Sequence, residues 1–171
     1  MNENLTLRAL EKNDLTFVHA LHNTPEIMDY WFEEPYLSFA SLEESFNKNK
    51  GNPRYRQFIL AKQDEQIGFV EMLNIDPHHR NAEFTIIIAP DHQGNGYAKA
   101  ATRLAMDYAF KVLNLHKLYL FADTLNKKAV HIYEKVGFQK EGVSRELFFV
   151  NGSYHDATVM SILDRDYWEM S

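Results

Sequence analysis

The stretch that decides the fold is Ile86-Ile87-Ile88-Ala89-Pro90-Asp91-His92-Gln93-Gly94-Asn95-Gly96-Tyr97-Ala98. Its first three residues are apolar and β-branched, which predicts a strand in the middle of a sheet with both faces covered. Pro90 ends this strand, and the residues up to Gly96 are typical of a tight turn before a helix. Glycines in such a turn allow successive backbone amides to point at one anion, such as a pyrophosphate. They suit equally a turn that only caps the helix, so the turn alone leaves both interpretations open.

Further helix and strand patterns surround this turn. The helix that begins at Tyr97 is expected to run to Asn114, and another is expected over residues 126–136. Thr24 is expected to cap a short helix that starts at Pro25, and a further helix is expected to begin at Ser38, with Ser41 and Glu44 at capping-box spacing. Asn151-Gly152 predicts a hairpin between the last two strands. Strands are expected at residues 5–10, 56–62, 66–75, 81–89, 116–123, 139–150 and 153–163. These patterns, without any linker or repeat, predict one mixed α/β domain over residues 1–171.

The charge and composition of the chain exclude several classes of function. The 171 residues include 18 Lys and Arg against 24 Asp and Glu, a formal net charge of −6. A net anion is repelled by nucleic acids and anionic membranes and suits a cationic partner. The turn lacks the third glycine of the dinucleotide fingerprint and the Gly-Lys-Ser/Thr of the P-loop, and the absence of cysteine excludes disulfides and a Cys nucleophile.

The sequence also predicts a cytoplasmic location. Residues 1–10 lack the basic start and apolar core of a signal peptide. No segment approaches the roughly 20 apolar residues of a membrane helix. No metal site is expected, because His78 and His79 are adjacent rather than spaced to share one face.

A second motif follows the strand expected at 116–123. Asn126-x-x-Ala129-x-x-x-Tyr133-x-x-x-Gly137-Phe138, together with Gln93-x-x-Gly96-x-Ala98, resembles the acetyl-coenzyme A signature of the GCN5-related N-acetyltransferase (GNAT) superfamily. The order of elements is also similar over nearly the whole chain. The resemblance implies the GNAT fold, a mixed, mostly antiparallel sheet of about seven strands flanked by about four helices. It implies that acetyl-CoA is the acetyl donor and is bound by Ile86, Ile87, Ile88, Gln93, Gly94, Asn95, Gly96, Tyr97, Ala98, Lys99, Asn126, Ala129 and Lys135.

Several other segments resemble the bacterial spermidine/spermine N-acetyltransferases within this superfamily. The most distinctive is Tyr30-Trp31-Phe32-Glu33-Glu34-Pro35-Tyr36, and others are Ala82-Glu83-Phe84, His92-Gln93-Gly94 and Phe148-Phe149-Val150-Asn151-Gly152. The resemblance implies acetyl transfer to a primary amine of a polyamine, by direct attack in a ternary complex. It also implies a homo-oligomer, with a dodecamer-type ring as one form and a further polyamine site between subunits.

The resemblance implies two catalytic residues. Tyr133 would be the general acid that protonates the departing sulfur of coenzyme A. Glu83 would be the base, acting through a water molecule. From the residues alone, Tyr133 suits equally an amphipathic core position and Glu83 a surface carboxylate on a strand edge, so both assignments depend on the surrounding motif.

Acceptor binding is expected in an acidic and aromatic tract between Glu26 and Tyr36. Carboxylates match the charge of a polyamine, and aromatic faces add cation–π attraction of about 0.5 to 2 kcal/mol. Phe32 is expected to pack the short helix on the core instead. The substrate-binding residues are expected to be Met28, Trp31, Glu33, Glu34, Tyr36 and Thr85.

Some positions depart from the polyamine group and keep two alternatives open. Ser41 and Asn74 stand where relatives usually have glutamate, and residues 48–56 form a basic loop, which weakens the expected site between subunits. The loop favours an alternative acceptor, the N-terminus of a ribosomal or other protein. A second alternative is a non-catalytic sensor that binds acyl-CoA, although binding alone would not require Tyr133.

Overall fold

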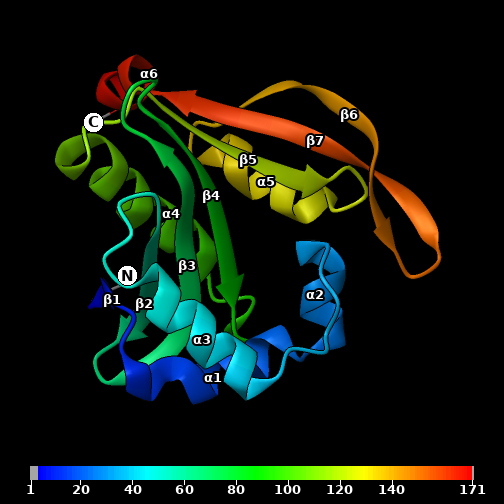
Figure 1. Ribbon diagram of the computed structural model, residues 1–171. Helices are drawn as coiled ribbons and strands as arrows, with labels where there is room; N and C mark the ends of the chain where they lie inside the picture. The colour runs from blue at the N-terminus through cyan, green and yellow to red at the C-terminus, as the bar shows by residue number, and fades with distance from the viewer. Residues whose placement is uncertain (1–3, 171) are drawn as a thin grey trace.

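A computed structural model describes residues 4–170, in which seven strands form one sheet of order β1-β2-β3-β4-β5-β7-β6 (Figure 1). The strands are β1 (Leu5–Ala9), β2 (Arg56–Lys62), β3 (Glu65–Asp76), β4 (Asn81–Ile88), β5 (Lys117–Asp123), β6 (Gln139–Val150) and β7 (Ser153–Leu163). Neighbouring strands are antiparallel except β4 and β5, which are parallel. The central position expected for the strand of residues 86–88 is therefore confirmed.

The contact between β4 and β5 is short. Only Asn81, Ala82 and Glu83 of β4 pair with β5, opposite Lys117, Leu118 and Tyr119. After these pairs the two strands separate, and Figure 1 shows β1–β4 and the β5-β7-β6 group diverging like the arms of a V. Residues 84–88 of β4 keep their β3 partners but have no strand partner on the β5 side.

Six α-helices cover the two faces of the sheet in the part of the chain that the structure describes. They are α1 (Leu15–His22), α2 (Pro25–Trp31), α3 (Phe39–Asn49), α4 (Tyr97–Asp107), α5 (Lys127–Lys135) and α6 (Asp164–Glu169). The short α6 was not predicted, and α4 continues into a π-helical turn over Tyr108–Val112. Along the described residues, no helix is long and apolar enough to cross a membrane. Residues 1–3 of the segment assessed for a signal peptide lie outside the described part.

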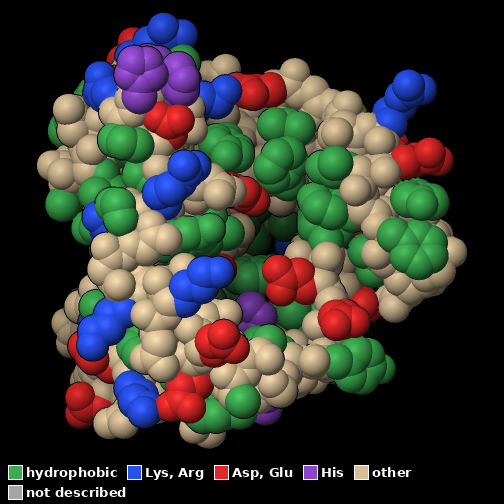
Figure 2. Space-filling view, in the orientation of Figure 1, with side chains coloured by type: hydrophobic (Ala, Val, Ile, Leu, Met, Phe, Trp, Pro, Cys, Tyr) green, Lys and Arg blue, Asp and Glu red, His purple; other side chains and the backbone are tan. Residues whose placement is uncertain are grey.

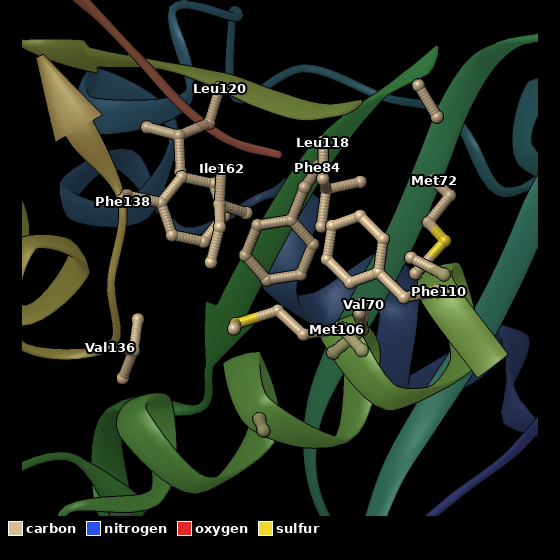
Figure 3. Packing of buried hydrophobic residues seen from close by; sticks show 14 of the residues in the cluster. Val70, Met72, Phe84, Met106, Phe110, Leu118, Leu120, Val136, Phe138 and Ile162 are labelled. Atoms are coloured by element: carbon tan, nitrogen blue, oxygen red, sulfur yellow. The ribbon is translucent and has the colours of Figure 1, made fainter. Parts of the chain in front are cut away.

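Alternation along the strands divides the core into two clusters on opposite faces of the sheet. Phe69 of β3 packs in the cluster beneath α1 and α2, whereas the next residue, Val70, packs in the larger cluster beneath α4 and α5. In the larger cluster Met106 and Phe110 lie against Phe84 and neighbouring strand residues (Figure 3). The three isoleucines divide in the same way, with Ile87 in the smaller cluster and Ile86 and Ile88 packed against the larger one.

Local signals explain most element boundaries. The helix expected from Ser38 is α3, and Ser38 itself is the cap, because its Oγ accepts the Ser41 backbone N–H at 3.1 Å. The expected capping box of Ser41 and Glu44 is wrong, since both residues lie inside the helix. The helix after Thr24 begins as expected at Pro25, but the expected Thr24 cap is wrong: its hydroxyl donates to the Ala20 carbonyl at 2.9 Å. The hydroxyl is thus engaged with the preceding helix instead.

Candidate active site

A cleft of about 350 Å³ opens where β4 and β5 separate. Its walls come from α2 and the loop after it, from β3, β4, β5 and β6, and from α5. Figure 2 shows the hollow near the centre of the molecule, with acidic side chains at its edge. Among its lining residues are Trp31, Glu33, Glu83, Thr85, Ile86, Asn126, Ala129 and Tyr133, all selected from the sequence.

The side chains of this cleft carry negative charge. Four carboxylates line it, those of Glu33, Glu71, Glu83 and Asp123. No Lys or Arg among residues 4–170 lines it. Asp123 Oδ2 lies 2.6 Å from His155 Nδ1, and Glu33 Oε2 lies 3.9 Å from His22 Nδ1. The hydrogen bonds of Glu71 and Glu83 are to uncharged side chains. Carboxylates with so few basic partners attract positive charge in a partly enclosed site. The cleft therefore suits a cationic ligand.

Tyr133 projects from the last part of α5 into the same cleft. Its ring packs edge-on against Phe84, with 6.4 Å between ring centroids, and lies 5.7 Å from the ring of Phe138. Burial raises the pKa of Tyr133 to about 12. The phenol is therefore protonated at neutral pH and can act as a proton donor.

The glycine turn before α4 has the backbone geometry expected for an anion site. Gly94 and Gly96 have φ values of 81° and 76°, in the left-handed region that favours glycine. Gly96 is the N-cap residue of α4, so the amides of the first helical turn have no partners within the helix. These amides and the helix dipole can hold an anion at this end of α4.

The unpaired edge of β4 links this turn to the cleft. A groove of about 430 Å³ runs along Ile86, Ile87 and Ile88 and is also lined by Trp31 and Gln93. The Ile86 carbonyl accepts from Trp31 Nε1 at 3.2 Å, and the Ile88 carbonyl accepts from Gln93 Nε2 at 3.1 Å. Because Trp31 and Ile86 also line the cleft, an extended ligand can reach from the turn to Tyr133.

Comparison with known proteins agrees with this geometry. A family model described as an acetyltransferase (GNAT) domain matches residues 4–139. The chain belongs to this family. The chain is 51% identical to a spermidine N(1)-acetyltransferase of Vibrio cholerae, over 100% of this chain and 99% of the relative. It is 48% identical to a spermidine N(1)-acetyltransferase of Escherichia coli K12, over 94% of this chain and 87% of the relative.

Solved structures confirm the GNAT fold. The structure of spermidine N-acetyltransferase from Vibrio cholerae in complex with CoA and spermine superimposes with a TM-score of 0.95 at 51% identity. The match covers 96% of this chain and 98% of that chain. The expected mostly antiparallel sheet of seven strands is thus confirmed, while the number of α-helices is six in the described residues rather than about four.

The GNAT motif on α5 has a local structural cause. Asn126 is the N-cap residue of α5, and its Oδ1 accepts the Ala129 backbone N–H at 3.1 Å. This contact explains the Asn-x-x-Ala spacing, and both residues also line the cleft. By contrast, Lys99 and Lys135 are exposed and line neither the cleft nor the β4 groove.

Glu83 is the last residue of β4 that pairs with β5, at the point where the V of this GNAT sheet opens. Its Oε2 is 3.5 Å from Asn74 Nδ2, and partial burial raises the pKa of its carboxyl group. Glu83 therefore faces the cleft, as expected for a base. Asn74 makes this contact without adding a second charge.

Two carboxylates of this GNAT cleft, Glu71 on β3 and Asp123 on β5, were not predicted from the sequence. The exposed fraction of Glu71 is 7%, and its side chain lies between Gln57 and Thr85 on the neighbouring strands. Burial, with the nearby charges of Glu33 and Glu83, raises the pKa of Glu71 to about 7. One signal was available: Glu71 is the single charged residue in the strand segment Ile67 to Leu73.

Only some of the residues expected to bind the acceptor line the cleft. Trp31, Glu33 and Thr85 line it, whereas Glu34 and Tyr36 are exposed outside it. Met28 is fully buried in the smaller core cluster and lines neither the cleft nor the β4 groove. Met28 and Trp31 are three positions apart and share one face of α2, which packs on the smaller core cluster. Trp31, at the end of the helix, is only partly buried there and also lines the cleft.

Phe32 differs from its expected core packing. It ends α2 in the left-handed conformation, with φ 59°. Its ring stacks on Phe148 of β6, with centroids 3.6 Å apart and 6° between the planes. The expectation that Phe32 packs the helix on the core is therefore wrong, and the stacked pair joins α2 to the opposite arm of the V.

The basic loop over residues 48–56 lies away from the cleft walls. None of its lysines or arginines lines the cleft, and Arg56 bonds through Nε to the Tyr108 hydroxyl at 3.1 Å. The Arg56 Nη1 also donates to the Tyr55 carbonyl at 2.8 Å.

Ser41 contributes to the cap of α3, where its Oγ accepts a hydrogen bond from the Ser38 hydroxyl at 2.8 Å. Over residues 4–170, no group of three or more His, Asp or Glu is placed to hold a metal ion.

Proposed function

We propose that the chain transfers the acetyl group of acetyl-CoA to a primary amine of a polyamine such as spermidine or spermine. The observation that carries the proposal is the cleft next to the Tyr133 phenol, which is lined by four carboxylates and, within residues 4–170, by no Lys or Arg. Relatives about half identical along the whole chain are named spermidine N(1)-acetyltransferases. A cationic acceptor fits such a cleft, whereas the absence of positive charge disfavours an anionic acceptor.

The acetyl donor would lie along the unpaired edge of β4. Its pyrophosphate would be held by the amides of the glycine turn at Gly94–Ala98, which need no basic side chain. Its pantetheine arm would pair with β4 at residues 86–88 as an added strand does, replacing the present bonds of Trp31 and Gln93. Asn126 and Ala129 would flank the thioester from α5, with Lys99 and Lys135 left to the outer phosphates.

In the proposed reaction the amine nitrogen forms a bond to the acetyl carbon, and the carbon–sulfur bond breaks. An ammonium group becomes an amide, so the nitrogen loses two protons. One of them ends on sulfur through Tyr133, and the other leaves to solvent through a carboxylate. Holding both reactants in one cleft contributes about 7 to 11 kcal/mol to lowering the barrier.

The acidity of Tyr133 constrains how it acts. With a pKa of about 12, the phenol is a weaker acid than a thiol of pKa about 8.5, by roughly 5 kcal/mol. Full transfer of its proton to a free thiolate would therefore be unfavourable. Tyr133 would instead give its proton to sulfur while it regains one from the reacting nitrogen, so the phenolate does not accumulate.

The chain is also proposed to form a cytoplasmic homo-oligomer, with a dodecamer-type ring as the form suggested by its resemblance. Phe149 and Tyr154, at the tip of the β6–β7 hairpin, are 62% and 65% exposed. Their rings contact each other, with centroids 5.1 Å apart. Exposed aromatic side chains that contact each other across a hairpin favour a surface that binds another protein chain.

A panel of acceptors tests the proposed function. Purified protein would be given acetyl-CoA with spermidine, spermine, or peptides that begin with Ser or Ala, and release of free coenzyme A would be measured. We expect turnover with the polyamines and at most slow turnover with the peptides. Faster turnover with peptides would identify an N-terminal protein acetyltransferase. Binding of acetyl-CoA without turnover of any acceptor would identify a sensor and contradict the enzymatic proposal.

A further inference from the structure

Glu71 forms part of the wall between two hollows. It lines the active-site cleft and also a second hollow of about 290 Å³ that lies beneath α1 and α3. Trp31, Glu33 and Leu73 line both hollows as well. Glu71 therefore borders both the cleft and the second hollow.

The hydrogen bonds of Glu71 hold its carboxylate without neutralising it. Gln57 Nε2 donates to Oε1 at 2.8 Å, and Thr85 Oγ1 donates to Oε2 at 3.3 Å. Both donors are uncharged, and they come from the strands on either side of β3. The carboxylate is thus fixed in orientation while its charge remains available to a cation.

The titratable groups around Glu71 are almost all acidic. Glu33 follows α2, Glu83 lies on β4, and Asp123 lies at the end of β5, where its Oδ2 is 2.6 Å from Nδ1 of His155 on β7. From α1 comes His22, whose pKa is lowered by burial, so it stays neutral at pH 7. From α5 comes Tyr133. The residues that α3, β2 and β6 contribute to these walls do not titrate; they are Leu42, Ser45, Phe46, Asn49, Gln57 and Phe148.

We propose that Glu71, rather than Glu83, is the proton acceptor for the amine in this chain and binds its ammonium before transfer. The inference rests on the proposed polyamine acetylation. The N–H bond of the ammonium breaks and an O–H bond forms on the Glu71 carboxylate. The neutral amine then attacks the thioester, and the proton leaves Glu71 to water in the second hollow after the product departs.

Two properties favour Glu71 over Glu83 for this task. An efficient base has a pKa close to the working pH, and the value of about 7 for Glu71 meets this condition. Its orientation is also fixed by two hydrogen bonds at 2.8 and 3.3 Å, whereas Glu83 has one contact at 3.5 Å. Glu83 would then supply negative charge at the mouth of the V without taking the proton.

The test compares the pH dependence of kcat/KM for spermidine in the wild type and in Glu71→Gln, Glu83→Gln and Glu44→Gln. Wild-type kcat/KM should fall about tenfold per pH unit below a pH near 7, as Glu71 becomes protonated. Glu71→Gln should lose roughly 100-fold or more in kcat and should also lose this acidic limb. Glu83→Gln should keep the limb. Glu44 is an exposed carboxylate on α3 outside both hollows, so Glu44→Gln should match the wild type.

A second variant protects the test against misfolding of Glu71→Gln. Gln57→Leu removes a hydrogen bond that favours charged Glu71, so the acidic limb should move to higher pH. Circular dichroism and the dissociation constant for coenzyme A would verify folding of every variant. A Glu71→Gln enzyme with wild-type kcat and an unchanged limb would overturn the inference, as would loss of the limb in Glu83→Gln. A wild type inactive on every amine would instead overturn the proposed function.

Discussion

The glycine turn suits an anion and uses backbone amides, whereas the acidic cleft suits a cation and uses side-chain carboxylates. At the turn, Gly94 and Gly96 adopt positive φ and present backbone amides, with no basic side chain needed to attract an anion. In the cleft, four carboxylates from separate elements face one space. The first site depends on local backbone geometry, and the second depends on how the sheet brings distant side chains together. Variants should therefore affect the two sites independently.

A change at Tyr133 should lower the rate of the reaction without weakening binding at either site, because Tyr133 binds neither the anion nor the cation. Tyr133→Phe should lower kcat by roughly 100-fold or more, since general acid catalysis contributes about 10²–10⁴-fold. The KM for spermidine and the dissociation constant for acetyl-CoA should stay within about twofold, because the ring packing against Phe84 and Phe138 is retained. Steady-state kinetics and calorimetric binding check the result. An unchanged kcat would remove Tyr133 from the reaction.

Glu33→Gln should act on the cation side alone. Loss of a charge that faces the ammonium should raise the KM for spermidine roughly tenfold, because a hydrogen bond to a charged group contributes about 1.5–3 kcal/mol. The KM for acetyl-CoA should not change. Glu34→Gln offers a matched comparison, since Glu34 is adjacent but lies outside the cleft. Equal effects of the two substitutions would mean that the tract acts through overall charge rather than through the cleft.

Gly96→Ala should act on the anion side alone. There is space for a β carbon, since none of the described atoms beyond the adjacent residues lies within 4 Å of it, but φ of 76° is strained for alanine. The strain of about 1 kcal/mol should weaken coenzyme A binding about fivefold, with the KM for spermidine unchanged. Gly142→Ala, on β6, adds the same methyl group in open space without a positive φ. Equal coenzyme A affinity in both variants would show that the turn does not hold the cofactor.

Elements with local signals could be predicted from the sequence. The central strand that ends before Pro90, the hairpin at Asn151-Gly152 and the helix that starts next to Ser38 each depend on neighbouring residues, and each is present. The boundary between α4 and the π-helical turn was missed, because it depends on packing of Tyr108–Val112 rather than on propensity. The short α6 has no long apolar periodicity to reveal it.

The cleft could be predicted only in part. Trp31, Glu33 and Glu83 were found, because they stand in motifs that resemble a family. Glu71 was missed, because its surroundings come from two other strands. It pairs with Thr85 on β4 and with Gln57 on β2, and no single segment of sequence reveals this arrangement. Met28 was assigned to the acceptor tract by its nearness in sequence, although the helical turn places it in the core.

The three-pair junction between β4 and β5 also leaves an exposed strand edge inside the sheet. Open edges can recruit strands from other chains and so begin aggregation. Here the indole of Trp31 and the amide of Gln93 occupy the carbonyls of Ile86 and Ile88. Because these two hydrogen bonds engage the edge carbonyls, the edge is less open to strands from other chains. A ligand that offers its own donors can replace them. Protection from self-association and access to the cleft thus depend on the same two hydrogen bonds.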